Sequence, residues 1–128
     1  MDQDQAEEAL WQAVLRCQGE CFFTSSGLPF THEVKRKKNG EYSGELLISR
    51  KEVSKTLTKS SVMYAFRKVF SDGKNSGGAF TAPKYKAPKE IGQIFGISYS
   101  YSLFWKPGLI RVPEKVEKKA EGRKKDEF

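Results

Sequence analysis

The sequence predicts an α+β fold: an N-terminal helix, a small antiparallel β-hairpin or three-stranded sheet, then two to three C-terminal helices. Three observations predict it. Apolar residues recur every three to four positions over residues 3–18, alternate with polar ones over residues 28–34, and return to the helical period after residue 58. The 128 residues can bury a core without disulfides or metal, and we expect one domain over residues 1–112. Residues 113–128 are expected to be a charged tail that is either disordered or a frayed, solvated helix.

The first helix is predicted over residues 3–18, and Gly19 is expected to follow its end. Its apolar stripe has spacings of four, four and three: Ala6, Leu10, Val14 and Cys17. Cys17 and Cys21 are expected to be packed thiols, because a chain with two cysteines and one histidine has too few ligands for a typical zinc site.

The period then changes to two, which predicts strands. The residues expected to face the core are Leu28, Phe30, His32 and Val34. Asn39-Gly40 is a strong turn signal, and residues 45–50 are the expected returning strand, with Leu46 and Ile48 inward. Phe22 and Phe23 are predicted to form a short third strand.

A second helix is predicted to begin at a cap formed by Thr58 or Ser60. Its apolar face comprises Val62, Met63, Ala65, Phe66, Val69 and Phe70. Residues 71–78 have loop composition, and the loop is expected to continue to Pro88. Residues 88–105 are predicted to be helical again, with Ile91, Ile94 and Phe95 in an apolar stripe that Gly96 interrupts.

The net charge of +7 is concentrated in the middle of the chain. Residues 34–89 carry fourteen basic and four acidic side chains, whereas residues 1–33 carry one basic and six acidic. Such asymmetry indicates a surface that binds a polyanion. The densest cluster is Lys35, Arg36, Lys37 and Lys38, and we expect it to contact phosphates together with Arg50, Lys51, Lys55 and Lys59.

A second pattern lies in residues 88–105. Ile91 precedes the small Gly92, and Gly96 precedes Ile97 at a spacing that lets two helices cross around a glycine turn. This segment resembles the helix-turn-helix motif of DNA-binding proteins. The resemblance implies that Ser98, Tyr99, Ser100 and Tyr101 begin a recognition helix, although Ser102 replaces the apolar residue that the motif has there. Tyr85, Tyr99 and Tyr101 are also candidates for stacking on unpaired bases.

Catalysis is not expected. The sequence has no nucleophile elbow, dinucleotide fingerprint or Cys/His quartet, so we expect no cofactor and no metal. Glu33-Val34-Lys35 matches the Glu-x-Lys arrangement of metal-dependent nucleases, and a small nuclease is therefore one alternative. His32 is expected to be a packed residue and not a general base.

The expected function is thus non-catalytic nucleic-acid binding, with duplex DNA favoured over RNA. A protein–protein adaptor that docks an acidic partner is the other alternative. No apolar run approaches the roughly 18–20 residues of a membrane span, and the acidic start of the chain lacks the apolar region of a secretory signal. We therefore expect a cytoplasmic protein with no membrane partner.

Overall fold

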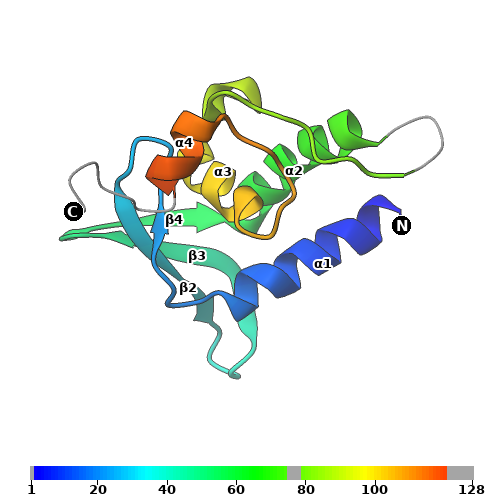
Figure 1. Ribbon diagram of the computed structural model, residues 1–128. Helices are drawn as coiled ribbons and strands as arrows, with labels where there is room; N and C mark the ends of the chain where they lie inside the picture. Colours follow the sequence, from blue (N-terminus) through cyan, green and yellow to red (C-terminus); the bar gives the residue numbers. More distant parts are fainter. Residues whose placement is uncertain (1, 75–78, 121–128) are drawn as a thin grey trace.

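The computed structural model describes residues 2–74 and 79–120, and it confirms the α+β class (Figure 1). A four-stranded antiparallel sheet follows the first helix, and the remaining helices follow the sheet. The helices are α1 (Gln3–Arg16), α2 (Lys59–Gly73), the 3₁₀ turn η1 (Pro88–Glu90), α3 (Ile97–Trp105) and α4 (Glu114–Ala120). The strands are β1 (Phe22–Phe23), β2 (Pro29–Arg36), β3 (Tyr42–Arg50) and β4 (Val53–Thr58).

The strands are ordered β1-β2-β3-β4, each antiparallel to the next. The hairpin and the short strand at Phe22–Phe23 are as predicted, but β4 was not predicted. Of its six residues only Leu57 is buried, so β4 lacks the alternation by which a half-buried strand is recognised. Its turn, Lys51-Glu52, also lacks the usual glycine, and Lys51 itself takes the left-handed conformation with φ of 54°.

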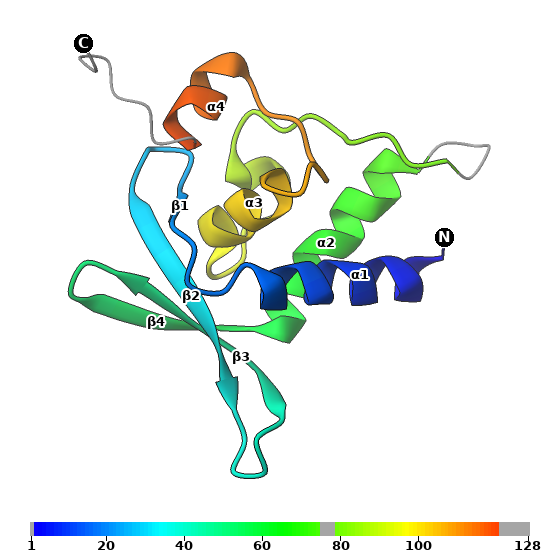
Figure 2. The ribbon, with the colours of Figure 1, turned by 60° about the horizontal axis from the view of Figure 1, so that its bottom comes forward.

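One face of the sheet forms the core, and the helices α1, α2 and α3 lie on that side (Figures 1 and 2). The buried side chains of this face are Phe30, His32, Val34, Leu46, Ile48 and Leu57. Leu28 was wrongly predicted to join them. Leu28 precedes β2 in a turn that two backbone groups of Leu28 close: its N–H donates a hydrogen bond to the Thr24 hydroxyl, and its carbonyl accepts one from Thr24 N–H. The Leu28 side chain is 41% exposed.

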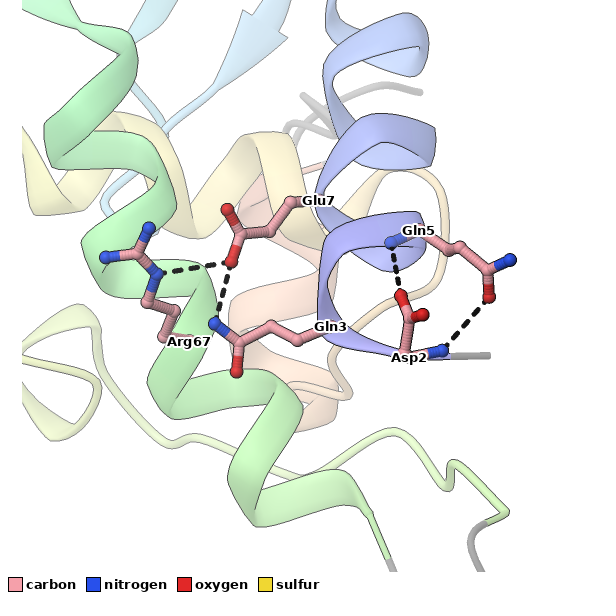
Figure 3. A network of polar contacts seen from close by, with 5 residues as sticks. All are labelled: Asp2, Gln3, Gln5, Glu7 and Arg67. Carbon is pink, nitrogen blue, oxygen red and sulfur yellow. Dashed lines mark hydrogen bonds and ion pairs between the residues drawn. The ribbon is translucent and has the colours of Figure 1, made fainter.

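The two long helices pack side by side in opposite directions. Figure 3 shows the polar link between them: Arg67 Nε on α2 lies 3.1 Å from Glu7 Oε2 on α1, and Gln3 donates to the same oxygen. Burial raises the pKa of Glu7, but these two hydrogen bonds and the nearby positive charges outweigh that effect, so its pKa is lowered overall. The side chains of Asp2 and Gln5 form a capping box at the start of α1.

α1 ends at Arg16, two residues earlier than predicted, because the next residues bond to the sheet. The Gln18 side chain accepts a hydrogen bond from Val34 N–H, and Gly19 N–H donates to the His32 carbonyl. α2 is longer than predicted: Ser71, Asp72 and Gly73 are helical, and the loop begins after them. Residues 75–78 of the predicted loop lie outside the described residues.

In the C-terminal part of the chain, the helix predicted over residues 88–105 is interrupted. Residues 91–96 are not helical, and Gly96 adopts a φ of 75° directly before α3 begins. In the predicted tail, residues 114–120 form α4, and Val116 of this helix packs partly buried against the core. The rest of the predicted tail, residues 121–128, lies outside the described residues.

Candidate nucleic-acid interface

The basic residues of the sheet gather at its two hairpin turns. We call Lys37 and Lys38 the β2–β3 tip, and Arg50 and Lys51 the β3–β4 tip. β3 joins the two tips, and its nine residues extend at most about 30 Å at 3.3–3.4 Å per residue. In Figure 2 the two hairpins project from the molecule in different directions. The cations predicted to form one cluster are therefore separated into two.

Arg36 organises the β2–β3 tip from within. Its guanidinium donates to the Gly40 carbonyl at 2.7 Å and to the Tyr42 hydroxyl at 2.8 Å, and its centre lies 4.1 Å from the centroid of the Tyr42 ring. Gly40 has the φ of 88° that the Asn39-Gly40 turn signal predicts. Arg36 is exposed as well, but these contacts fix its guanidinium against the turn, whereas Lys37 and Lys38 are the exposed cations at the end of the hairpin.

Lys35 lies on the open face of the sheet, between the tips. Its ammonium donates to the Thr56 hydroxyl at 3.2 Å and lies 4.0 Å from a Glu45 carboxylate oxygen. Glu33, on the same strand and the same face, is also exposed. The middle of the open face thus carries two carboxylates beside one lysine, and the positive charge is strongest at the ends.

The β3–β4 tip has a half-buried Arg50 and an exposed Lys51. Lys55 follows on β4, opposite Ile48, and is exposed because the helices do not reach this edge. Lys59 points elsewhere: its ammonium lies 4.7 Å from the centroid of the Trp11 ring on α1. Lys59 therefore holds α1 and α2 together and belongs to neither tip.

The segment that resembles a helix-turn-helix contains one 3₁₀ turn and one α-helix. η1 comprises only Pro88–Glu90, and α3 begins after the left-handed Gly96. A side chain at Gly96 would meet the Leu57 side chain, since an ideal Cβ built there lies 2.5 Å from Leu57 Cδ1. The glycine of the motif is thus required both for its backbone conformation and for close contact with β4.

The tyrosines predicted to contact nucleic acid are core residues. Tyr99 is 6% exposed and packs edge-on against Phe30, with 5.0 Å between ring centroids. Tyr101 is 1% exposed, and its hydroxyl donates to the Tyr85 carbonyl at 2.6 Å. Burial, with a smaller effect from Glu90, raises the pKa of Tyr101 to about 12. Both residues therefore leave the candidate interface.

The neighbouring polar residues of α3 are also explained by packing. Ser102, which departs from the motif, is buried and donates to the Phe23 carbonyl of β1 at 2.7 Å. Ser98 is half-buried in the first turn of α3. The Tyr85 hydroxyl donates to Asp72 at 2.5 Å, so the third tyrosine proposed to stack on bases is also internal.

Phe95 is an exposed aromatic residue that the sequence placed in the core. Its side chain is 60% exposed, although the helical stripe placed it in the core. The predicted stripe assumed helical spacing up to Gly96, whereas the helical turn already ends at Glu90 and residues 91–96 lead into α3 without a helix.

The nuclease alternative gains no metal site from the fold. Glu33 and Lys35 lie side by side on the open face, but within residues 2–74 and 79–120 no three His, Cys, Asp or Glu side chains gather closely enough to hold a metal ion. His32 is buried and faces the core, as predicted.

The fold and the surface together define an α+β protein whose one-sided antiparallel sheet carries a basic tip at each end. No protein-family model, curated protein or solved structure matches this chain. Among the described residues, none of the helices is long and apolar enough to cross a membrane.

Proposed function

We propose that this protein is a non-catalytic nucleic-acid-binding protein that binds duplex DNA through the two tips of its sheet. The observation that carries the proposal is the placement of exposed cations beyond both ends of β3, a strand whose nine residues extend at most about 30 Å. One turn of B-DNA is about 34–36 Å long, so the length of β3 is comparable to, and somewhat shorter than, one turn of a duplex that contacts both tips.

The charge distribution supports contact at the ends and not in the middle. Glu33 and Glu45 would repel phosphates that approach the centre of the open face, whereas Lys37, Lys38 and Lys51 are exposed cations. Lysine needs no fixed geometry to attract a phosphate, which suits positions in turns.

Duplex DNA is favoured over duplex RNA because of groove shape. The major groove of B-DNA, about 12 Å wide, admits a two-stranded β-ribbon such as the β2–β3 hairpin. The major groove of A-form RNA is too narrow for side chains to read. Tyr99 and Tyr101 have no role in this proposal, since both are in the core.

Salt-dependent affinity tests the proposal. Each phosphate contact contributes about 0.9 to the slope of log affinity against log salt on duplex DNA. We expect Lys37→Gln/Lys38→Gln to reduce the magnitude of this slope by up to about 1.8, the contribution of two phosphate contacts. Arg50→Gln/Lys51→Asn should reduce it by a similar amount. Asparagine is used at position 51 because it tolerates positive φ. Lys86→Gln/Lys89→Gln is the matched control, with both exposed lysines beside or within η1.

Duplex length tests the two-tip geometry. A duplex of one full turn or longer should be sensitive to both pairs of substitutions, whereas one of about half a turn, roughly 5 base pairs, can contact only one tip. Failure to retard duplex DNA, single-stranded DNA or RNA at low salt would refute the proposal. Binding to an acidic polypeptide but not to DNA would favour the adaptor instead.

A further inference from the structure

A cavity of about 490 Å³ lies on the helical side of the molecule, between α1, α2 and the turn after α3. None of its lining residues belongs to either basic tip. On α1 the wall is formed by small side chains on one face: Ala6, Ala9 and Ala13. Small-molecule sites in proteins measure roughly 300–1,000 Å³, so this cavity has the volume of a ligand site.

The other walls are apolar and largely aromatic. Phe66 and Phe70 of α2 line the cavity with ring centroids 6.0 Å apart, and Phe80 stacks on Phe70 at a centroid distance of 6.0 Å. Leu10 and Leu109 complete this lining. Such walls favour a hydrocarbon chain, because each methylene group that is transferred from water into the cavity increases the binding affinity.

Among the described residues that line the cavity, the charged ones are Arg16 and Lys74, both of them exposed cations. Arg16 is the last residue of α1, and Lys74 directly follows α2. Because the two helices run in opposite directions (Figure 2), these cations lie at opposite ends of the cavity. The described lining residues include no carboxylate, so a ligand with negative charge meets attraction at either end and no repulsion from the lining.

The length of the cavity limits the ligand. From Ala6 to Arg16 the helix rises about 15 Å at 1.5 Å per residue. An extended chain of roughly ten carbons advances about 1.25 Å per bond, or about 11 Å, and the carboxylate and the terminal methyl group bring its overall length to about 15 Å.

We propose that this cavity binds an amphipathic anion, an unbranched medium-chain carboxylate. The hydrocarbon chain lies between the alanines of α1 and the phenylalanines, and the carboxylate pairs with Arg16. A guanidinium can bind a carboxylate through two parallel hydrogen bonds. Lys74 is the weaker choice because its ammonium already lies 5.8 Å from the centroid of the Phe70 ring.

The test titrates the full chain with sodium decanoate, below its micelle concentration, by calorimetry and by amide NMR. Decanoate should shift signals of α1, of the second half of α2 and of residues 107–109. Octanoate should bind roughly tenfold more weakly, since it lacks two methylenes. Decanol should bind at least tenfold more weakly because it lacks the charge, and decyltrimethylammonium should not bind at this site.

Two variants locate the site. Arg16→Gln should weaken decanoate at least tenfold, with Lys89→Gln as the control for loss of a positive charge. Ala9→Leu should fill part of the cavity and abolish binding, whereas Ala87→Leu, at an exposed alanine outside the cavity, should leave it unchanged. Thermal unfolding of each variant confirms that it is folded.

Three results would overturn the proposal. They are equal binding of decanoate and decyltrimethylammonium, binding seen only above the micelle concentration, and unchanged decanoate affinity in folded Ala9→Leu. None of these results depends on whether the protein binds DNA, because no residue of either tip lines the cavity.

Discussion

The ring of His32 on β2 forms a hydrogen bond to the Val14 carbonyl on α1, with Nε2 2.8 Å from the oxygen. A carbonyl only accepts, so Nε2 carries the proton and Nδ1 does not. Nδ1 is buried without a hydrogen-bond partner among the described residues. The ring is fully buried, with the Phe22 ring at a centroid distance of 5.7 Å. Burial lowers the pKa of His32, against smaller opposing effects of the Val14 bond and of Glu20 and Glu33.

The burial of His32 makes stability depend on pH. Because the pKa of folded His32 lies below its unfolded value of about 6.5, the unfolded chain binds more protons as the pH falls through that value. We expect the free energy of unfolding to be independent of His32 above about pH 7.5 and to decrease below about pH 6.5, by up to about 1.4 kcal/mol per pH unit.

Urea unfolding of the wild type and of His32→Gln, from pH 5 to pH 8, measures this effect. Glutamine does not titrate, so the difference in unfolding free energy between the two proteins should shrink as the pH falls. Parallel profiles for the two proteins would show that His32 does not carry the effect.

Among Gly92, Gly96 and Gly108, Gly96 is expected to be the least tolerant of substitution. Gly96→Ala combines a left-handed backbone with a Cβ only 2.5 Å from Leu57 Cδ1, whereas Gly108→Ala, at φ of 86°, meets nothing within 4 Å. We expect Gly108→Ala to cost about 1–2 kcal/mol from the backbone alone, and Gly96→Ala to cost more.

Gly92→Ala is the control, since its Cβ also meets nothing within 4 Å and its φ is not positive. Thermal or urea unfolding of the three variants separates backbone strain from overlap with Leu57. Equal losses at positions 96 and 108 would mean that Leu57 moves aside without cost.

Thr58 caps α2, because its hydroxyl accepts a hydrogen bond from Ser61 N–H at 3.1 Å. Replacing a threonine cap with alanine costs about 0.5–2 kcal/mol. We expect Thr58→Ala to destabilise the protein by that amount and Ser60→Ala, at an exposed position inside the helix, to change it little. Urea unfolding of the two variants measures both changes in unfolding free energy. A larger loss in Ser60→Ala than in Thr58→Ala would assign the cap of α2 to Ser60.

Tyr101 is expected to matter for stability and not for nucleic acid. Tyr101→Phe removes the 2.6 Å hydrogen bond to the Tyr85 carbonyl and leaves that acceptor without this donor in the core, a cost of about 1–3 kcal/mol. Tyr64→Phe, at a tyrosine that is 63% exposed, should cost almost nothing. A folded Tyr101→Phe protein with reduced DNA affinity would contradict the core assignment.

Much of the fold could be predicted because its signals are local. The apolar stripe of α1, the alternation of Phe30, His32 and Val34, and the Asn39-Gly40 turn each arise from neighbouring residues. β4 could not be predicted in this way, because it is held by pairing with β3 while most of its side chains stay in solvent.

The candidate site was predicted less completely. The basic composition of residues 34–59 identified the region, but it gave no indication that Arg36 is held by Tyr42 or that Lys59 lies over Trp11. The aromatic part of the site was wrong, since periodicity cannot distinguish a tyrosine that packs from one that protrudes.

The sequence by itself determined the α+β class, the first hairpin and the excess of positive charge in residues 34–89, because period, turn residues and charge are properties of short segments. The tertiary structure decided the rest. It separated the cations into two tips, buried Tyr99 and Tyr101, exposed Phe95 and opened a cavity between α1 and α2. These outcomes depend on which distant segments pack together, and the free energy of that packing is shared among residues far apart in the chain.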